Sequence, residues 1–426
     1  MKNILADILR ANSTYKDKPF YFLNLSIPVL AGVYVFASPL PLPSVNEFCF
    51  YLSCGALIIL LYFRKTGFSL RSPLTLPLML FFLWSVVGLF FTLDFANTLH
   101  DLRRHLLEYI ILYYLLINYF DSSKKLEALS WIVIISTTVF SLGLLIHYYF
   151  IAGYSFTDRL GYLTHYIHTN HIGFLTVSSI TLATQMLCRK KTFAEKLIFS
   201  LCIIVLGMAT FLTQSRGSLF GLVTAIVIIC FSNKKNVFFL AAILLLIMIA
   251  PGVIHREGPD SYTMSIRTKI NHLTMEIIKE HSVTGIGFGM EIYGNEALVD
   301  LKKYNSRLPL EFQQKDVVKS PHNILLDITV RTGMVGLMLY LYVIGMVLFM
   351  LWRSFRRTEN EYYRSWIICL LACFASFMVS SLFEDAQAGK PAVIYYTLLA
   401  MMGILWRLVQ KDSESRPEGL IPDEQT

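Results

Sequence analysis

Long apolar runs dominate the chain, and short polar connections separate them. A helix needs about 20 apolar residues to span a membrane. Twelve runs approach this length, with these bounds: 19–37, 48–63, 73–92, 106–120, 129–151, 170–188, 197–213, 217–232, 237–254, 322–352, 365–383 and 391–408. The runs 48–63 and 106–120 are short, so the number of spans is about twelve. The pattern predicts an all-α polytopic membrane protein.

Lys and Arg gather in every second connection between these runs. The groups are Arg64, Lys65 and Arg71; Lys124 and Lys125; Arg189, Lys190, Lys191 and Lys196; Lys234 and Lys235; and Arg353, Arg356, Arg357 and Arg364. The amino-terminal segment and the tail fall on the same side. Because cytoplasmic loops are enriched in these cations, we expect a multi-pass protein of a bacterial inner membrane with both termini cytoplasmic. The opposite loops then face the periplasm.

Composition agrees with a membrane protein. The chain is 55% hydrophobic and only 15% charged, with a mean hydropathy of +0.55, whereas soluble proteins carry about 25% charged residues. The net charge of +8 follows from the cytoplasmic loops, and no motif indicates a nucleic-acid partner. The seven cysteines lie in or beside apolar runs, which indicates no disulfide framework or zinc knuckle. The amino terminus lacks the features of a removable signal peptide.

These observations divide the chain into four parts. Residues 1–254 hold spans one to nine, 255–321 form a periplasmic loop, 322–408 hold spans ten to twelve, and 409–426 form a polar tail. Within the loop, apolar residues recur at helical spacing over residues 263–281, at Ile266, Ile270, Leu273 and Ile277. This stripe predicts an amphipathic helix, which the glycine-rich run 285–289 would end. We expect the loop to be helical and to fold down onto the membrane surface.

The most distinctive polar feature opens the tenth span. His322 and Asn323 follow a proline, and Gly333 and Gly336 come later in the same run. In a continuous helix Gly333 would lie beneath His322 on one face, since eleven residues make about three turns. The two glycines would leave a shallow groove for a close helix neighbour or for a lipid chain. His322 is then either a proton acceptor or a residue that caps the helix.

A second feature is the tight turn between the seventh and eighth spans, where Ser215 and Arg216 precede a glycine. An arginine among hydroxyl groups suits a phosphate, and an arginine at a span end can also reach the lipid headgroups. Arg267, on the amphipathic helix, and Arg159, in a nearly uncharged loop, are further outer-side cations. A solvated position is the default interpretation of both.

Three histidines recur every three residues around Asn170, at His165, His168 and His171. They drift around a helix, and no carboxylate is close in the sequence, so we predict no metal site. The chain also lacks the phosphate-binding loops of nucleotide enzymes.

Taken together, these motifs resemble those of the O-antigen ligase family, which includes the related polymerases. The shared elements are His322-Asn323 followed by Gly333 and Gly336, the Ser-Arg-Gly-Ser turn at 215–218, and Arg267 followed by a Gly-x-Gly-x-Gly run at 285–289. The specific motifs lie between about residues 210 and 336. The first 150 residues resemble the family only as hydrophobic spans.

The resemblance implies a reaction. Such a ligase transfers a polysaccharide from undecaprenyl pyrophosphate to a sugar hydroxyl of lipid A–core at the periplasmic face, with inversion and without a cofactor or metal. It implies that His322 accepts the hydroxyl proton and that Arg216 and Arg267 stabilise the diphosphate. To the surrounding substrate-binding site we assign these residues: Arg159, His168, Asn170, Ser215, Asn323, Gly333 and Gly336.

The sequence leaves other functions open. An O-antigen polymerase would use the same donor, and a protein O-oligosaccharyltransferase would use a protein acceptor. A transporter of lipid-linked sugars would need charges near the middle of the membrane. Only Asp327 and Arg331 stand out there, and their i,i+4 spacing allows them to pair with one another.

Overall fold

The fold was analysed in a computed structural model of the chain. It describes residues 18–161, 168–190, 192–232, 260–313 and 320–414. All the secondary structure in these ranges is helical, with no strand among them. The predicted all-α class is therefore confirmed.

The helices follow one another along the chain with short connections. The order is α2 (Lys18–Ala37), α3 (Pro43–Tyr62), α4 (Thr75–Val87), α5 (Phe95–Asp101), α6 (Glu108–Tyr119), α7 (Ser123–Leu145), α8 (Thr169–Arg189), α9 (Phe193–Leu212), α10 (Arg216–Ser232), α12 (Asp260–Glu280), α13 (Leu301–Ser306), α14 (Ile324–Arg357), α15 (Glu361–Ser381) and α16 (Gly389–Glu414). A π-helical segment, Leu102–Leu107, joins α5 to α6, and another, Ile146–Ile151, extends α7.

Eleven of the twelve predicted spans coincide with helices, and the ninth, 237–254, lies outside the described residues. Eight described helices are long and apolar enough to cross a membrane, and two shorter apolar helices cover 75–90 and 216–230. The short predicted run 106–120 is the end of a helix that begins at Phe95. The chain is thus a polytopic helical protein, while twelve remains a prediction.

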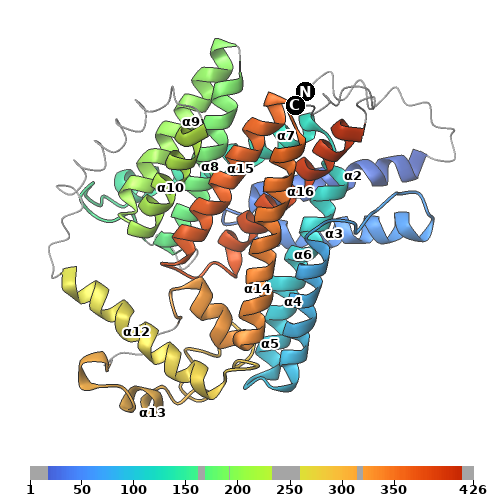
Figure 1. Cartoon of the computed structure of the whole chain (residues 1–426). Helices are drawn as coiled ribbons and strands as arrows, with labels where there is room; N and C mark the ends of the chain where they lie inside the picture. Colours follow the sequence, from blue (N-terminus) through green and yellow to red (C-terminus); the bar gives the residue numbers. More distant parts are fainter. Residues whose placement is uncertain (1–17, 162–167, 191, 233–259, 314–319, 415–426) are drawn as a thin grey trace, which may run out of the picture.

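The long helices form one body, with α12 and α13 at one end of it (Figure 1). The α8–α9 and α14–α15 connections lie at the opposite end, and these are two of the connections rich in Lys and Arg. This separation agrees with the predicted sidedness. Helix α16 is the most enclosed of the candidate spans, since 94% of its apolar window is buried. It packs on α6, α15 and α14 and forms the centre of the core.

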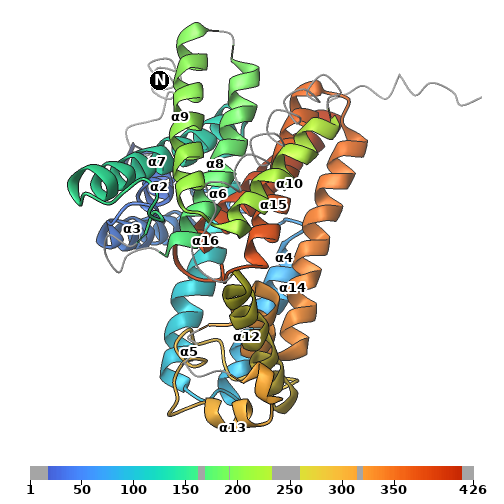
Figure 2. The same cartoon turned by 90° about the vertical axis from the view of Figure 1, so that its left-hand side faces the viewer.

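Helix α12 confirms the predicted amphipathic helix. Its residues Ile270, Leu273 and Ile277 are buried, and they pack with Tyr293 and Leu301 into a small core of the 260–313 region. A quarter turn of the view shows α12 beside the first part of α14 (Figure 2), and contacts between the two helices agree. The apolar stripe is therefore covered by protein along this stretch.

Helix α14 is broken at Gly333, contrary to the continuous helix expected from sequence. Gly333 has φ 71° and ψ −177°, so it separates a short helix from a long one. The two parts bend toward each other: Ile324 and Val343 line the same narrow cavity, although a straight helix would hold them about 28 Å apart. The prediction that Gly333 lies beneath His322 on one helix face is wrong.

The space beside Gly333 is filled by protein backbone. A Cβ atom there would lie 1.9 Å from the carbonyl oxygen of Val283, and Met334 N donates to Ser282 O at 2.8 Å. Gly336 packs as closely on the Thr332 side chain, near Trp84. Of the two uses predicted for these glycines, a close neighbour is therefore the one observed, and no open lipid groove lies at either position.

The glycine-rich turn 285–289 supplies the backbone groups that the broken helix lacks. Ile286 N and Gly287 N donate to the carbonyls of Val330 and Arg331, at 2.9 and 3.0 Å. Broken helix ends need such partners, because their last carbonyls lack intrahelical donors. The turn therefore completes the end of the short helix, and it fastens the 260–313 region to α14.

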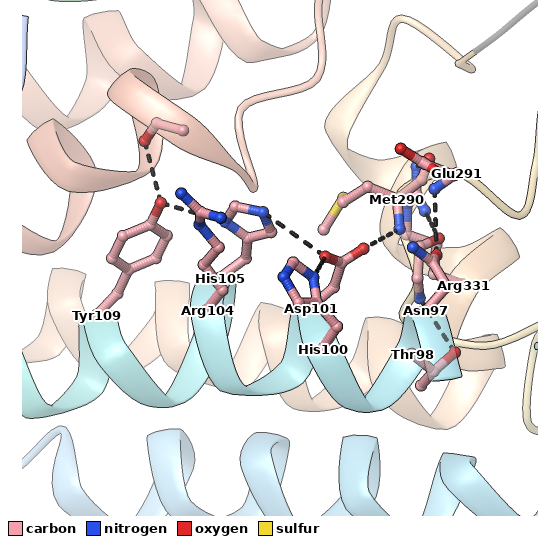
Figure 3. Close-up of polar contacts among 12 residues, drawn as sticks. Asn97, Thr98, His100, Asp101, Arg104, His105, Tyr109, Met290, Glu291 and Arg331 are labelled. Carbon is pink, nitrogen blue, oxygen red and sulfur yellow. Dashed lines mark hydrogen bonds and ion pairs between the residues drawn. The ribbon is translucent and has the colours of Figure 1, made fainter. Parts of the chain in front are cut away.

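Buried polar side chains also hold the glycine-rich turn against its neighbours, as Figure 3 shows for Asp101 and Arg331. The Arg331 guanidinium pairs with Asp327 at 2.7 Å and donates to the carbonyl of Gly289. Asp101, which is also buried, accepts from Met290 N at 2.7 Å. The predicted pairing of Asp327 with Arg331 is confirmed, and the pair serves a structural junction.

Candidate active site

His322 lies just before α14 in an unusual backbone conformation. Its φ is 51°, which is uncommon for a residue with a side chain. The helix cap is Asn323, whose side chain accepts from Leu325 N and Leu326 N at 3.0 and 3.3 Å. The capping role considered for His322 therefore belongs to its neighbour, and the imidazole is directed to another partner.

That partner is Glu384, in the connection between α15 and α16. His322 Nδ1 lies 2.5 Å from Glu384 Oε1. The Glu384 side chain is only 3% exposed, whereas that of His322 is 33% exposed. The pair thus consists of a buried carboxylate and a histidine that remains open on one side.

Asn170 and Arg159 extend the cluster from the other oxygen of Glu384. Asn170 Nδ2 donates to Glu384 Oε2, and Arg159 Nη2 donates to Asn170 Oδ1 at 2.7 Å. Arg159 Nε also donates to the carbonyl of Thr213 at 2.8 Å. Arg159 is therefore not a simple solvated cation, because it links the cluster to the turn before α10.

The turn at 213–218 is held close to the cluster by small residues. Ser215 caps α10, accepting weakly from Ser218 N at 3.4 Å. A Cβ on Gly217 would lie 2.9 Å from Cβ of Phe383, and one on Gly173 would overlap the Ser218 hydroxyl. Small residues let helices approach in this way. Gly217, the residue after Arg216, is consequently packed against Phe383, the residue before Glu384.

Arg267 approaches the same phenylalanine from α12. Its guanidinium carbon lies 5.8 Å from the centre of the Phe383 ring, within the range of a cation–π contact. Its charge also acts on His322, where it opposes protonation. Helices α10 and α12 therefore bring two arginines to the vicinity of one His–Glu pair.

The electrostatics of the cluster favour a proton-accepting His322. Burial lowers the pKa of His322, but the hydrogen bond and the charge of Glu384, with Asp385 beyond it, outweigh burial and raise this pKa above its ordinary value. Burial is the largest influence on His168 and lowers its pKa. The pKa values of these two imidazoles, whose ring centres lie 6.5 Å apart, are thus shifted in opposite directions.

The structure brings together most of the predicted site residues. Arg159, His168, Asn170 and His322 meet around Glu384. Arg267 lies near Phe383, and Ser215 and Arg216 immediately precede Gly217, which packs on the same phenylalanine. Asn323 acts as a helix cap, and Gly333 and Gly336 act in packing. His165 lies outside the described residues.

Glu384 itself was missed by the sequence analysis. It is 62 residues from His322 and 214 from Asn170, so no local spacing connects them. Its one signal was a pair of adjacent acids, Glu384 and Asp385, at the start of a predicted outer loop. The sequence analysis found no carboxylate close to the three histidines. In the folded chain this is wrong, because Glu384 Oε2 is 3.6 Å from His168 Nδ1.

A comparison with protein families identifies the central part of the chain. Residues 201–341 match the family model described as O-antigen ligase, and this range includes Arg216, Arg267 and His322. The search of curated proteins found no match. Residues 201–341, which carry all three of these side chains, are therefore similar to the O-antigen ligase family.

Proposed function

We propose that the chain is an O-antigen ligase that transfers a polysaccharide from undecaprenyl pyrophosphate to a sugar hydroxyl of lipid A–core. The similarity of residues 201–341 to the O-antigen ligase family supports a ligase- or polymerase-type glycosyltransferase. The contact of His322 with Glu384, on which the charge of Arg267 acts, is the observation that carries the proposal. The reaction takes place at the periplasmic face of the inner membrane, on the side of α12.

His322 acts as the general base. Its Nδ1 faces Glu384, so a neutral imidazole that donates from Nδ1 presents the Nε2 lone pair to the acceptor hydroxyl. Glu384 then orients the ring and stabilises the imidazolium that forms, as a carboxylate does beside a histidine in hydrolases. Glu384 is a positioning residue in this scheme, because it acts through His322.

Arg216 and Arg267 stabilise the diphosphate leaving group. As the acceptor oxygen bonds to the anomeric carbon with inversion, the bond to the phosphate oxygen breaks and its electron pair remains on the diphosphate. Guanidinium groups suit this charge, since they bind phosphate oxygens in a bidentate manner. The amino-terminal end of α10, where Arg216 lies, adds a further preference for anions.

Two arginines in this position replace a divalent metal as the source of positive charge. Arg159 contributes indirectly to the proposed mechanism, because it holds Asn170 against Glu384. The buried pair of Asp327 and Arg331 gives no support to the transporter alternative, since its charges compensate each other inside the junction.

The test is a transfer assay with purified full-length protein, lipid-linked polysaccharide and lipid A–core. His322→Ala should lower transfer by about 10²- to 10⁴-fold, the usual contribution of a general base, and Arg216→Ala should lower it comparably. His147→Ala, at an exposed histidine, is the matched control and should retain activity. A His322→Ala protein with full activity would remove the base from the mechanism.

A deletion strain separates the ligase from its nearest alternative. Loss of a ligase leaves unmodified core lipopolysaccharide together with intact lipid-linked polymer. Loss of a polymerase instead leaves core capped by a single repeat unit. Transfer to a protein acceptor by the purified chain would favour an oligosaccharyltransferase.

A further inference from the structure

The cluster around Glu384 also has the composition of a transition-metal site. His168 and His171 lie at the start of α8, with ring centres 5.6 Å apart. Glu384 Oε2 is 3.6 Å from His168 Nδ1. Ligand atoms of these three residues all lie within 4.8 Å of one another. Two imidazoles and one carboxylate form a common zinc-binding set, which leaves a fourth position open.

The spacing is close to that required by a bound ion. Tetrahedral zinc with bonds of 2.0–2.1 Å holds its ligand atoms about 3.4 Å apart. The distance from His168 to Glu384 already approaches this value. The His171 ring, whose Nε2 lies 4.0 Å from Asp385 Oδ1, has a ligand atom within 4.8 Å of the other two, so a small adjustment brings the three together.

Exposure gives an ion access from the outer side. The side chains of His168 and His171 are 40% and 25% exposed, and Glu384 lies beneath them at 3%. An incoming ion meets the imidazoles first and then the carboxylate. Asn170 occupies the same oxygen of Glu384 and must move aside, and the charge of Arg159 beyond it weakens the attraction. These features indicate reversible binding.

We propose that His168, His171 and Glu384 form an inhibitory site for Zn²⁺ or a similar transition-metal ion. The bound ion takes one oxygen of the carboxylate whose other oxygen pairs with His322 at 2.5 Å. The inhibition rests on the proposed function, whereas the metal binding does not.

Metal binding is tested first, with no reference to activity. Full-length protein in detergent is stripped with EDTA, and ZnCl₂ is added in a calorimetric titration and in a metal analysis after desalting. We expect one zinc equivalent in the wild type and in His147→Gln, and its loss in His171→Gln. Mg²⁺ should not compete, because it prefers oxygen ligands. Equal zinc binding by His171→Gln and the wild type would overturn the site.

Inhibition is tested in the transfer assay with the same three proteins. Zinc should inhibit the wild type and His147→Gln alike. In His171→Gln the half-inhibitory zinc concentration should rise at least about tenfold, because even an outer-shell change weakens metal sites by about 10- to 100-fold. Its activity without zinc should match the wild type. Acceleration of transfer by zinc would overturn the inhibitory role. A chain that binds zinc but never transfers would instead contradict the proposed function.

Discussion

Two groups of acidic and basic residues involve α14 and the residues just before it, and they differ in exposure. Asp327 and Arg331 are 0% and 1% exposed, and Arg331 also donates to the carbonyls of Gly289 and Met290. His322 is 33% exposed and touches one buried carboxylate. The first group is almost fully buried, whereas the second has an open side.

The difference separates a structural role from a chemical one. A buried ion pair with its hydrogen bonds in place fixes a junction, and removing one partner leaves an uncompensated charge. A half-exposed histidine on a buried carboxylate keeps a nitrogen for an external group. The contrast predicts that changes in the first group affect folding and changes in the second affect transfer.

The largest expected effect tests the structural role of the Asp327–Arg331 pair. Arg331→Met leaves Asp327 buried without its partner, which should cost about 3–5 kcal/mol of stability. Thermal unfolding in detergent and the amount of protein in membranes measure the loss. The double variant Asp327→Leu/Arg331→Met should recover much of it, because apolar replacement of both partners is often neutral. A stable Arg331→Met single variant would end the structural interpretation.

Glu384→Gln tests the proposed chemical role of the His322–Glu384 pair. The amide keeps the shape of the side chain but removes the charge that raises the pKa of His322. Transfer should fall by about 10²- to 10⁴-fold, the upper value being that of a buried carboxylate beside a catalytic histidine in a hydrolase. Protein levels should be unchanged.

The pH profile of the same variant gives a second measurement, made in EDTA to exclude metal ions. A base must be neutral, so activity falls as the pH drops through the pKa of His322. Without the Glu384 charge this pKa is lower, and the acidic limb of the profile should move to lower pH. An unmoved limb with reduced activity would indicate that Glu384 only supports the fold.

Gly333→Ala sharpens the contrast within one helix. The new Cβ would clash with the Val283 carbonyl, and φ at this position is 71°, so the change should cost about 1–3 kcal/mol. Gly345→Ala is the matched control on the same helix, because nothing lies within 4 Å of its Cβ position. The melting temperatures of the two variants should differ clearly. Equal melting temperatures would contradict the break at Gly333.

The smallest expected effect concerns chelation. Addition of EDTA to the purified chain should leave transfer intact, or raise it if zinc was carried through purification. The reason is that guanidinium groups, and no metal, balance the diphosphate charge in the proposed mechanism. A loss of transfer that added metal restores would identify a required ion.

Hydropathy predicted the helices well because each span is a single apolar run that must satisfy its own backbone in lipid. The same criterion could not find the break at Gly333, since the chain is apolar on both sides of it. The break depends on hydrogen bonds from Ile286 and Gly287, which lie in a different part of the sequence. Hydropathy indicates whether a segment lies in an apolar environment, but it does not indicate which distant segments form hydrogen bonds with it.

The candidate site was predicted in part for a similar reason. His322, Arg216 and Arg267 stand in recognisable local motifs, so the resemblance identified them without a structure. Glu384 has no such motif, and its contact with Asn170 spans 214 positions. Long-range pairing of this kind follows from the packing of α8, α10 and α15, which the sequence pattern leaves undetermined.

The fastening of the glycine-rich turn to α14 constrains any redesign of this protein. Backbone hydrogen bonds join residues 282–287 to residues 330–334 at several points, so the 260–313 region and the beginning of α14 form one mechanical unit. A chimaera that exchanges α12 for that of another enzyme must therefore carry the segment around Gly333 with it. Grafting α12 alone would remove these hydrogen bonds, and His322 would no longer keep its position relative to Arg267.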